Sequence, residues 1–167
     1  VDHLHQLGHT KLVLVTPPLH VFERGGAYSW RFRDAAAQRA AALGIELSIH
    51  DGESRQPAID ENLHRILDEN ADATGVIMHN DASVAALPHV LHQRGVSVPA
   101  DLSVVSLYSR DFARWFSLPY TAVESSPGVL AEVAVHQLVQ RIGSPEAAGP
   151  HGTRLVTAEL IDRGSTR

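Results

Sequence analysis

The chain has 167 residues, 44% of them hydrophobic, and it contains no cysteine. This length suits one ordinary globular domain with a hydrophobic core, and the absence of cysteine excludes disulfides and thiolate zinc sites. The formal net charge is -5 and the basic residues are scattered singly, which argues against nucleic-acid binding by this segment, because phosphate affinity requires clustered Lys and Arg.

The first part of the chain alternates predicted strands and helices. Residues 1–9 are typical of the end of a helix, and a strand over 11–16 ends at two prolines, which cannot donate to a β-ladder. We expect a polar loop over 19–28 and then an alanine-rich helix over 30–43. Alternating Ile and Leu predict the next strand over 45–49.

The middle of the chain continues this alternation. Apolar residues recur at helical spacing from Ile59 onward, which predicts an amphipathic helix. A short apolar strand over 76–78 follows, then a helix over 81–94 that ends at Gly95, because glycine readily adopts the left-handed C-cap conformation. A dense apolar run over 102–107 suits a parallel strand covered on both faces.

The last part predicts one helix and two short strands. The helix runs over 127–142, a loose linker covers 144–152, and the strands lie at 153–156 and 159–161. Strands that alternate with helices of this length predict βαβ units, and therefore a Rossmann-like parallel sheet flanked by helices, in the α/β class.

Several short motifs occur in a fixed order along the chain. They are Leu4-x-x-Leu7-Gly8-His9, Asn80-Asp81, Gly95, VPADLSVVSL over 98–107, Pro119, Thr121, Val123 and Glu159-Leu160-Ile161-x-Arg163-Gly164-Ser165-Thr166. In this order they resemble the effector-binding domain of LacI/GalR-type transcription regulators, and the resemblance covers nearly the whole chain. It implies a periplasmic-binding-protein-like architecture.

The resemblance also implies how the domains are organised. Residues 1–167 would form the carboxyl-terminal portion of an effector-binding and dimerisation domain. A helix-turn-helix headpiece and a first effector subdomain are expected upstream of residue 1, so that contact with DNA is made only through the absent headpiece. In the family the last helix returns to the first subdomain, and we therefore expect the helix over 127–142 to lack its partner here.

Asn80 and Asp81 are the first candidates for an effector site. They follow an apolar strand, at the edge where open α/β sheets bind ligands. The amide of Asn80 can both donate to and accept from a sugar hydroxyl, and the resemblance places the family's effector-contacting asparagine at this position. The alternative for Asn80 is a helix cap, and Asp81 equally suits a cap or a first-turn charge.

Three further residues complete the predicted effector site. Tyr108 stands where the family usually carries an acidic residue, which implies stacking on a ring or one hydrogen bond, with core packing as the alternative. The resemblance also implies an arginine near the start of the first helix. Arg31 fits by spacing, with Arg33 behind it, and a solvated helix face is the alternative. Asp51, close to Glu53, lies at a strand end and either contacts the effector or forms a turn.

A homodimer interface is predicted from an aromatic cluster and one helix. Phe112, Trp115 and Phe116 stand close together in a chain that is only 5% aromatic, and such clusters form either core or interface anchors. The resemblance implies that this loop, together with Ala85 and His89 of the helix after the asparagine, builds the dimer contact.

Catalysis and cofactor binding find no support in the sequence. No Walker loop, GxGxxG fingerprint or GxSxG elbow occurs, so we expect no catalytic residue and no cofactor. His5 and His9, like His89 and His92, have a spacing that suits metal ligands, but no third ligand completes either pair, and we expect no metal site. A phosphoacceptor receiver domain needs an acidic pair after its first strand, where this chain has Thr16 and two prolines.

These features predict the ligand-sensing part of a LacI-type DNA-binding transcriptional regulator, a repressor whose small, sugar-like effector modulates operator binding. The expected protein binds and does not catalyse. A solute-binding protein of a sugar transport system is the alternative, since it shares the fold but needs export. The first residues have no signal-peptide character and no apolar run approaches the about 20 residues that span a bilayer, so we expect a cytoplasmic protein without membrane contact.

Overall fold

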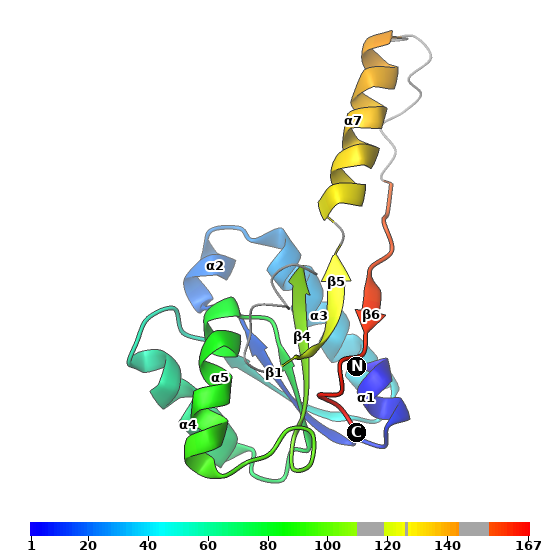
Figure 1. The fold of residues 1–167 in the computed structure, drawn as a ribbon. Coiled ribbons are helices and arrows are strands. Elements are labelled where there is room, and N and C mark those ends of the chain that lie inside the picture. The colour runs from blue at the N-terminus through cyan, green and yellow to red at the C-terminus, as the bar shows by residue number, and fades with distance from the viewer. Residues whose placement is uncertain (110–118, 126, 144–153) are drawn as a thin grey trace.

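The structure is a computed structural model that describes residues 1–109, 119–125, 127–143 and 154–167. Within these ranges it forms one sheet with helices on both faces (Figure 1). The strands are β1 (Lys11–Thr16), β2 (Glu46–Asp51), β3 (Gly75–Met78), β4 (Ser103–Ser109), β5 (Thr121–Ser125) and β6 (Glu159–Ile161). The helices are α1 (Asp2–Gln6), α2 (Leu19–Glu23), α3 (Ala27–Ala42), α4 (Ala58–Glu69), α5 (Asp81–Arg94) and α7 (Pro127–Gly143).

The strand order is β2-β1-β3-β4-β5-β6, and all neighbouring pairs are parallel except β5 and β6. The predicted α/β fold with a parallel sheet is therefore confirmed. β6 is antiparallel because the chain leaves the sheet through β5 and α7 and comes back beside β5 (Figure 1). The parallel arrangement brings the carboxyl ends of β1 to β4 to one edge of the sheet.

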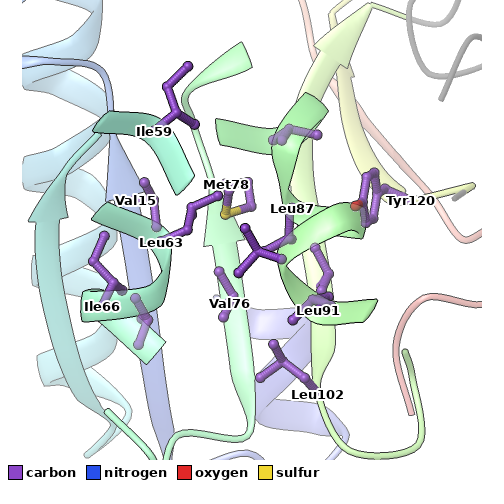
Figure 2. Close-up of a cluster of buried hydrophobic side chains, with 14 residues drawn as sticks. Val15, Ile59, Leu63, Ile66, Val76, Met78, Leu87, Leu91, Leu102 and Tyr120 are labelled. Atoms are coloured by element: carbon purple, nitrogen blue, oxygen red, sulfur yellow. The ribbon is translucent and has the colours of Figure 1, made fainter. Parts of the chain in front are cut away.

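The side chains of β1 alternate between two hydrophobic clusters. Val13 and Val15 pack with α4 and α5 on one face, while Leu12 and Leu14 pack with α1 and α3 on the other. This alternation explains the unbroken apolar run in a strand that is covered on both sides. Figure 2 shows the first cluster, in which the labelled residues are Val15, Ile59, Leu63, Ile66, Val76, Met78, Leu87, Leu91, Leu102 and Tyr120.

Gly95 ends α5, as predicted. Its φ is +66°, in the left-handed region, and the N–H groups of Gly95 and Val96 donate to carbonyls of the last helical turn. A residue with a Cβ would be strained in this conformation. The turn sends the chain back toward β4, so one glycine sets the length of α5 and the entry to the next strand.

The segment predicted as a loop over 19–28 contains a helix. α2 covers its first residues, and α3 begins at Ala27 rather than at Trp30. The reason is tertiary, because Phe22 of α2 is buried and its ring packs edge-on against Trp30 of α3, with 4.9 Å between the ring centroids. Pro18, with φ fixed at -59°, precedes α2 and suits a helix start.

β2 and β4 both end two residues later than predicted, and one further predicted strand also differs. β4 continues through Tyr108 and Ser109, because β5 offers ladder partners to both residues. The strand predicted over 153–156 is wrong where the structure describes it, since residues 154–158 have no regular structure. Leu155 is 88% exposed there, so no packing favours an extended ladder. The predicted linker over 144–152 lies outside the described residues.

α7 extends away from the sheet (Figure 1). None of its residues is buried, and six of its large hydrophobic side chains are exposed. These are Val129, Leu130, Val135, Leu138, Val139 and Ile142. α7 therefore presents an apolar surface that no other part of the described chain covers.

The last residues of the chain form hydrogen bonds at the amino ends of the strands, opposite the carboxyl edge. The N–H of Thr121 donates to Ser165 Oγ at 2.7 Å, and that hydroxyl donates to the carbonyl of Val104 at 2.6 Å. His3 Nε2 and Thr166 Oγ1 lie 2.9 Å apart. The tail therefore joins α1, β4 and β5 at the amino ends of the strands, away from the edge that carries the polar candidates.

Candidate functional site

Polar groups from three strand ends meet at the carboxyl edge of the sheet. Thr16 ends β1, Asp51 ends β2 and Asn80 follows β3. The hydroxyl of Thr16 donates to Asp51 Oδ1 at 3.0 Å, and the N–H of Gly52 donates to the carbonyl of Thr16 at 2.9 Å. This is the edge at which open α/β sheets bind ligands.

The amide of Asn80 is engaged within the protein. Its Nδ2 donates to the carbonyl of Glu53 at 3.0 Å and to Ser83 Oγ at 2.9 Å, and its Oδ1 accepts from the N–H of Ala82 at 3.2 Å. The residue is only 7% exposed. Asn80 thus caps α5, and both of its donor hydrogens are used, so that Oδ1, with a second lone pair, is the atom left for an effector.

The close approach of Asn80 depends on a glycine. A Cβ built on Gly52 would lie 2.1 Å from Asn80 Nδ2 and 2.7 Å from the carbonyl oxygen of Thr16. Both distances are shorter than real Cβ contacts, and one of them is to backbone. Gly52 therefore lets the loop after β2 lie directly against the turn between β3 and α5.

Asp81 is the first residue of α5 and carries a partly desolvated carboxylate. Burial raises its pKa above the ordinary value, while the helix N-terminus favours a negative charge at this position. Among the residues that the structure describes, the carboxylate has no hydrogen-bond partner. Asp81 is thus placed to accept hydrogen bonds from outside the protein, and Asn80, not Asp81, is the cap.

A buried histidine beside these residues was missed by the sequence analysis. His79 is 4% exposed, and burial lowers its pKa to about 4, so its ring is neutral at physiological pH. Its Nε2 lies 2.6 Å from the hydroxyl of Tyr28, and its ring contacts that of Phe32 at a centroid distance of 4.3 Å. The available signal was a second polar residue at the strand end, directly before Asn80.

The two arginine candidates of α3 have different surroundings. Arg31 is exposed, whereas Arg33 is partly buried and its guanidinium lies 5.8 Å from the ring centroid of Phe22 and 5.5 Å from that of Trp30. Such cation–π contacts hold Arg33 in one place. The structure thus gives Arg33 a fixed position, while Arg31 lies on the solvated face that the sequence left as its alternative.

The remaining candidates are only partly described. Tyr108 lies in β4 opposite Glu124 of β5, and its side chain is outside the described part of the chain. The same holds for the whole of three predicted interface residues, Phe112, Trp115 and Phe116. Ala85 and His89 lie one helical turn apart on α5 and are both exposed.

The described residues lack two further features. They contain no group of three His, Cys, Asp or Glu side chains that could hold a metal ion. Within the same ranges, no helix is both long and apolar enough to cross a membrane.

Comparison with known proteins gives related sequences over almost the entire chain. A family model for a periplasmic binding protein-like domain matches residues 1–166. The HTH-type transcriptional regulator MalR of Streptomyces coelicolor is 28% identical, over 99% of this chain and 48% of its own length. The ribose operon repressor of Escherichia coli is 27% identical, over 98% of this chain and 48% of its own length.

A solved structure agrees with these matches. The LacI family transcriptional regulator from Arthrobacter sp. FB24, in complex with lactose, superimposes with a TM-score of 0.80 at 21% identity, covering 99% of this chain and 60% of its own. At this identity the likeness shows the fold alone. The chain spans about half the length of the curated relatives it matches. It belongs to the periplasmic binding protein-like domain family, and its predicted resemblance to LacI/GalR-type transcriptional regulators is confirmed.

Proposed function

We propose that this chain is the ligand-sensing part of a LacI-type DNA-binding transcriptional regulator. Its effector is a small, sugar-like molecule that modulates operator binding and lies at the carboxyl edge of the sheet. The protein binds this effector without chemical conversion. The observation that carries the proposal is the coincidence of polar strand ends at this edge with whole-chain similarity to transcriptional regulators.

The proposed contacts follow from the geometry of that edge. Asp81 offers a carboxylate that no described residue pairs with, which is a favoured acceptor for hydroxyl groups, and Asn80 offers its remaining Oδ1 lone pair. Asp51, held by Thr16, lies at the same edge. Arg31 of α3 and Tyr108 at the end of β4 remain proposed contacts.

The proposed mechanism is a shift between two arrangements of the regulator. An effector changes operator binding only through its different affinities for the two arrangements. Asn80 is suited to transmit the difference, because the same side chain caps α5 and holds the carbonyl of Glu53 in the loop after β2. A ligand that touches Asn80 thus acts on two loops at once.

The partners proposed for the whole protein rest on its relatives. We propose a cytoplasmic homodimer that contacts DNA through a headpiece outside this chain. Ala85 and His89 on the exposed face of α5, with the aromatic residues Phe112, Trp115 and Phe116, are the proposed dimer contacts.

Thermal unfolding of the full-length protein with a panel of sugars tests the proposal. A ligand that binds the folded state stabilises it by RT ln(1 + [L]/Kd), about 2.7 kcal/mol at one hundred times Kd. We expect a raised Tm with at least one sugar and a smaller rise in Asp81→Asn.

Asp72→Asn is the matched control, because Asp72 pairs with Lys11 at the opposite edge of the sheet. An unchanged Tm with every sugar would refute a carbohydrate effector. An equal response of Asp81→Asn and the wild type would remove Asp81 from the site.

A further inference from the structure

Tyr28 is an exposed aromatic residue that a hydrogen bond to a buried histidine holds in place. It lies in the first turn of α3 and is 61% exposed. Its hydroxyl lies 2.6 Å from Nε2 of His79, and the two rings meet edge to face with centroids 5.0 Å apart. An exposed ring normally samples several rotamers, so this contact gives Tyr28 a defined orientation beside the carboxyl edge.

The surroundings of His79 fix the direction of that hydrogen bond. Among the described residues, Nδ1 of His79 is buried without a partner. A neutral imidazole carries one N–H, and a buried N–H without an acceptor is rarer in proteins than an acceptor without a donor. The proton therefore belongs on Nε2, which donates to the oxygen of Tyr28 and leaves the tyrosine O–H free to donate outward.

The charge near Tyr28 indicates which ligands suit it. Burial raises the pKa of Tyr28, and the nearby Asp81 carboxylate raises it further, so the hydroxyl stays protonated at physiological pH. This carboxylate accepts hydrogen bonds from hydroxyl groups and repels anions. An aromatic face next to such an acceptor suits a ligand with one apolar face and several hydroxyls.

We propose that Tyr28 contacts the effector directly, that His79 is its positioning residue, and that the pair, with Asp81, selects an uncharged sugar ring over a phosphorylated one. The inference rests on the proposed function and names the ligand class of the same site. In this arrangement the tyrosine ring packs on the apolar face of the sugar, its O–H donates to one ring hydroxyl, and Asp81 accepts from another.

Binding of a panel of neutral sugars, including D-ribose and lactose, and of their phosphates to the full-length protein tests this ligand class. The measurement is isothermal titration calorimetry with wild type, Tyr28→Ala and Tyr28→Phe. We expect neutral sugars to bind, and we expect Tyr28→Ala to lower their affinity about tenfold, the equivalent of about 1.4 kcal/mol. Tyr28→Phe keeps the ring and should lose about threefold, in line with one neutral hydrogen bond.

Trp30→Ala is the matched control, because Trp30 is a second exposed aromatic residue of α3 that packs on Phe22 instead of His79. Its sugar affinity should equal that of the wild type. Neutral binding that Tyr28→Ala leaves unchanged would overturn the inference while leaving the proposed function intact. Tighter binding of phosphorylated sugars would overturn it as well, and no binding of any sugar by the wild type would refute the proposed function itself.

The role of His79 needs a measurement that a purely structural role would not change. His79→Leu removes the donor, and His79→Gln keeps a donor near the position of Nε2. We expect His79→Leu to weaken sugar binding and His79→Gln to restore part of the affinity, with both variants compared at a temperature where circular dichroism shows them fully folded. Equal affinities of the two variants would exclude positioning of Tyr28 by His79.

Discussion

The side-chain amide of Asn80 donates a 3.0 Å hydrogen bond to the main-chain carbonyl of Glu53, and so joins the loop after β2 to the turn after β3. These two strands are not neighbours, because β1 lies between them. The hydrogen bond therefore spans the carboxyl end of β1, where the N–H of Gly52 also donates to the carbonyl of Thr16. Asn80 thus has a structural role, and a ligand at this edge meets a side chain that is already hydrogen-bonded within the protein.

Replacing Asn80 with alanine should destabilise the fold. The change removes the α5 cap and leaves the Glu53 carbonyl without its donor, which together cost about 2 to 4 kcal/mol of unfolding free energy. Ser83→Ala, which removes one of the partners of Asn80, should cost about 1 kcal/mol. Urea unfolding followed by circular dichroism measures both, and equal stability of Asn80→Ala and the wild type would contradict the proposed tie.

Gly52→Ala should destabilise the fold through a steric clash with Asn80 and Thr16. The new methyl group would meet Asn80 Nδ2 and the carbonyl of Thr16, and overpacking of this kind costs about 1 to 3 kcal/mol. Gly128→Ala in α7 is the control, because a Cβ there meets no atom within 4 Å and alanine favours a helix. We expect a lowered urea midpoint only for Gly52→Ala. A midpoint that both variants leave unchanged would show that the loop accommodates the methyl group.

His79 should make the fold less stable in acid. Its pKa is about 4 in the folded state against an ordinary value of 6.5, so the unfolded chain binds the proton more tightly. Its contribution is complete above pH 6.5 and is lost as the pH falls from 6.5 toward 4. At about 1.4 kcal/mol per pKa unit, the loss is on the order of 3 kcal/mol.

Urea unfolding at several pH values, with His79→Gln beside the wild type, isolates this effect. Glutamine does not titrate, and all other groups are shared, so the difference between the two curves reports His79 alone. The wild type should lose stability relative to His79→Gln below pH 6.5. Parallel curves down to pH 4 would show that the ring is protonated without cost in the folded state.

A charge on the exposed face of α5 should separate the proposed dimer. Ala85→Arg places two guanidinium groups against each other wherever two copies meet through this face, while its exposure leaves the fold unaffected. Sedimentation velocity of the full-length protein should show a dimer for the wild type and a monomer for the variant. Glu61→Arg, at an exposed position of α4, is the control, and a dimer that persists in Ala85→Arg would place the interface elsewhere.

The sequence predicted those helices and strands whose bounds depend on neighbouring residues in the chain. Gly95 marks the end of α5 because its conformation requires glycine, and the apolar run of β1 reflects burial on both faces. α2 escaped prediction because Phe22 is held by Trp30 of the next helix, which no local pattern reveals. The parallel sheet was predictable, whereas the antiparallel β6 depends on the route of the chain after α7.

The sequence indicated where polar side chains gather at the sheet edge, but it did not indicate their hydrogen bonds. A polar pair at a strand end indicated the carboxyl edge, and the cap alternative for Asn80 is confirmed by its contact with Ala82. Its bond to Glu53 spans 27 residues and the pair of Tyr28 and His79 spans 51, distances over which one sequence gives no pairing information. Only the folded chain shows that the donors of Asn80 are already used.

The contacts of the carboxyl-terminal tail have a consequence for the order of folding. They join Thr166 to His3 and Arg167 to His9, residues that are 163 and 158 positions apart in the sequence. Forming these contacts therefore closes a loop that contains nearly the whole chain. Closing so long a loop is entropically unfavourable, so we expect these contacts to form after the rate-limiting step of folding. Weakening them with Thr166→Val should therefore accelerate unfolding and leave the refolding rate unchanged in stopped-flow experiments. With that result, the carboxyl-terminal contacts would control how long the folded sheet persists and have no part in how fast it forms.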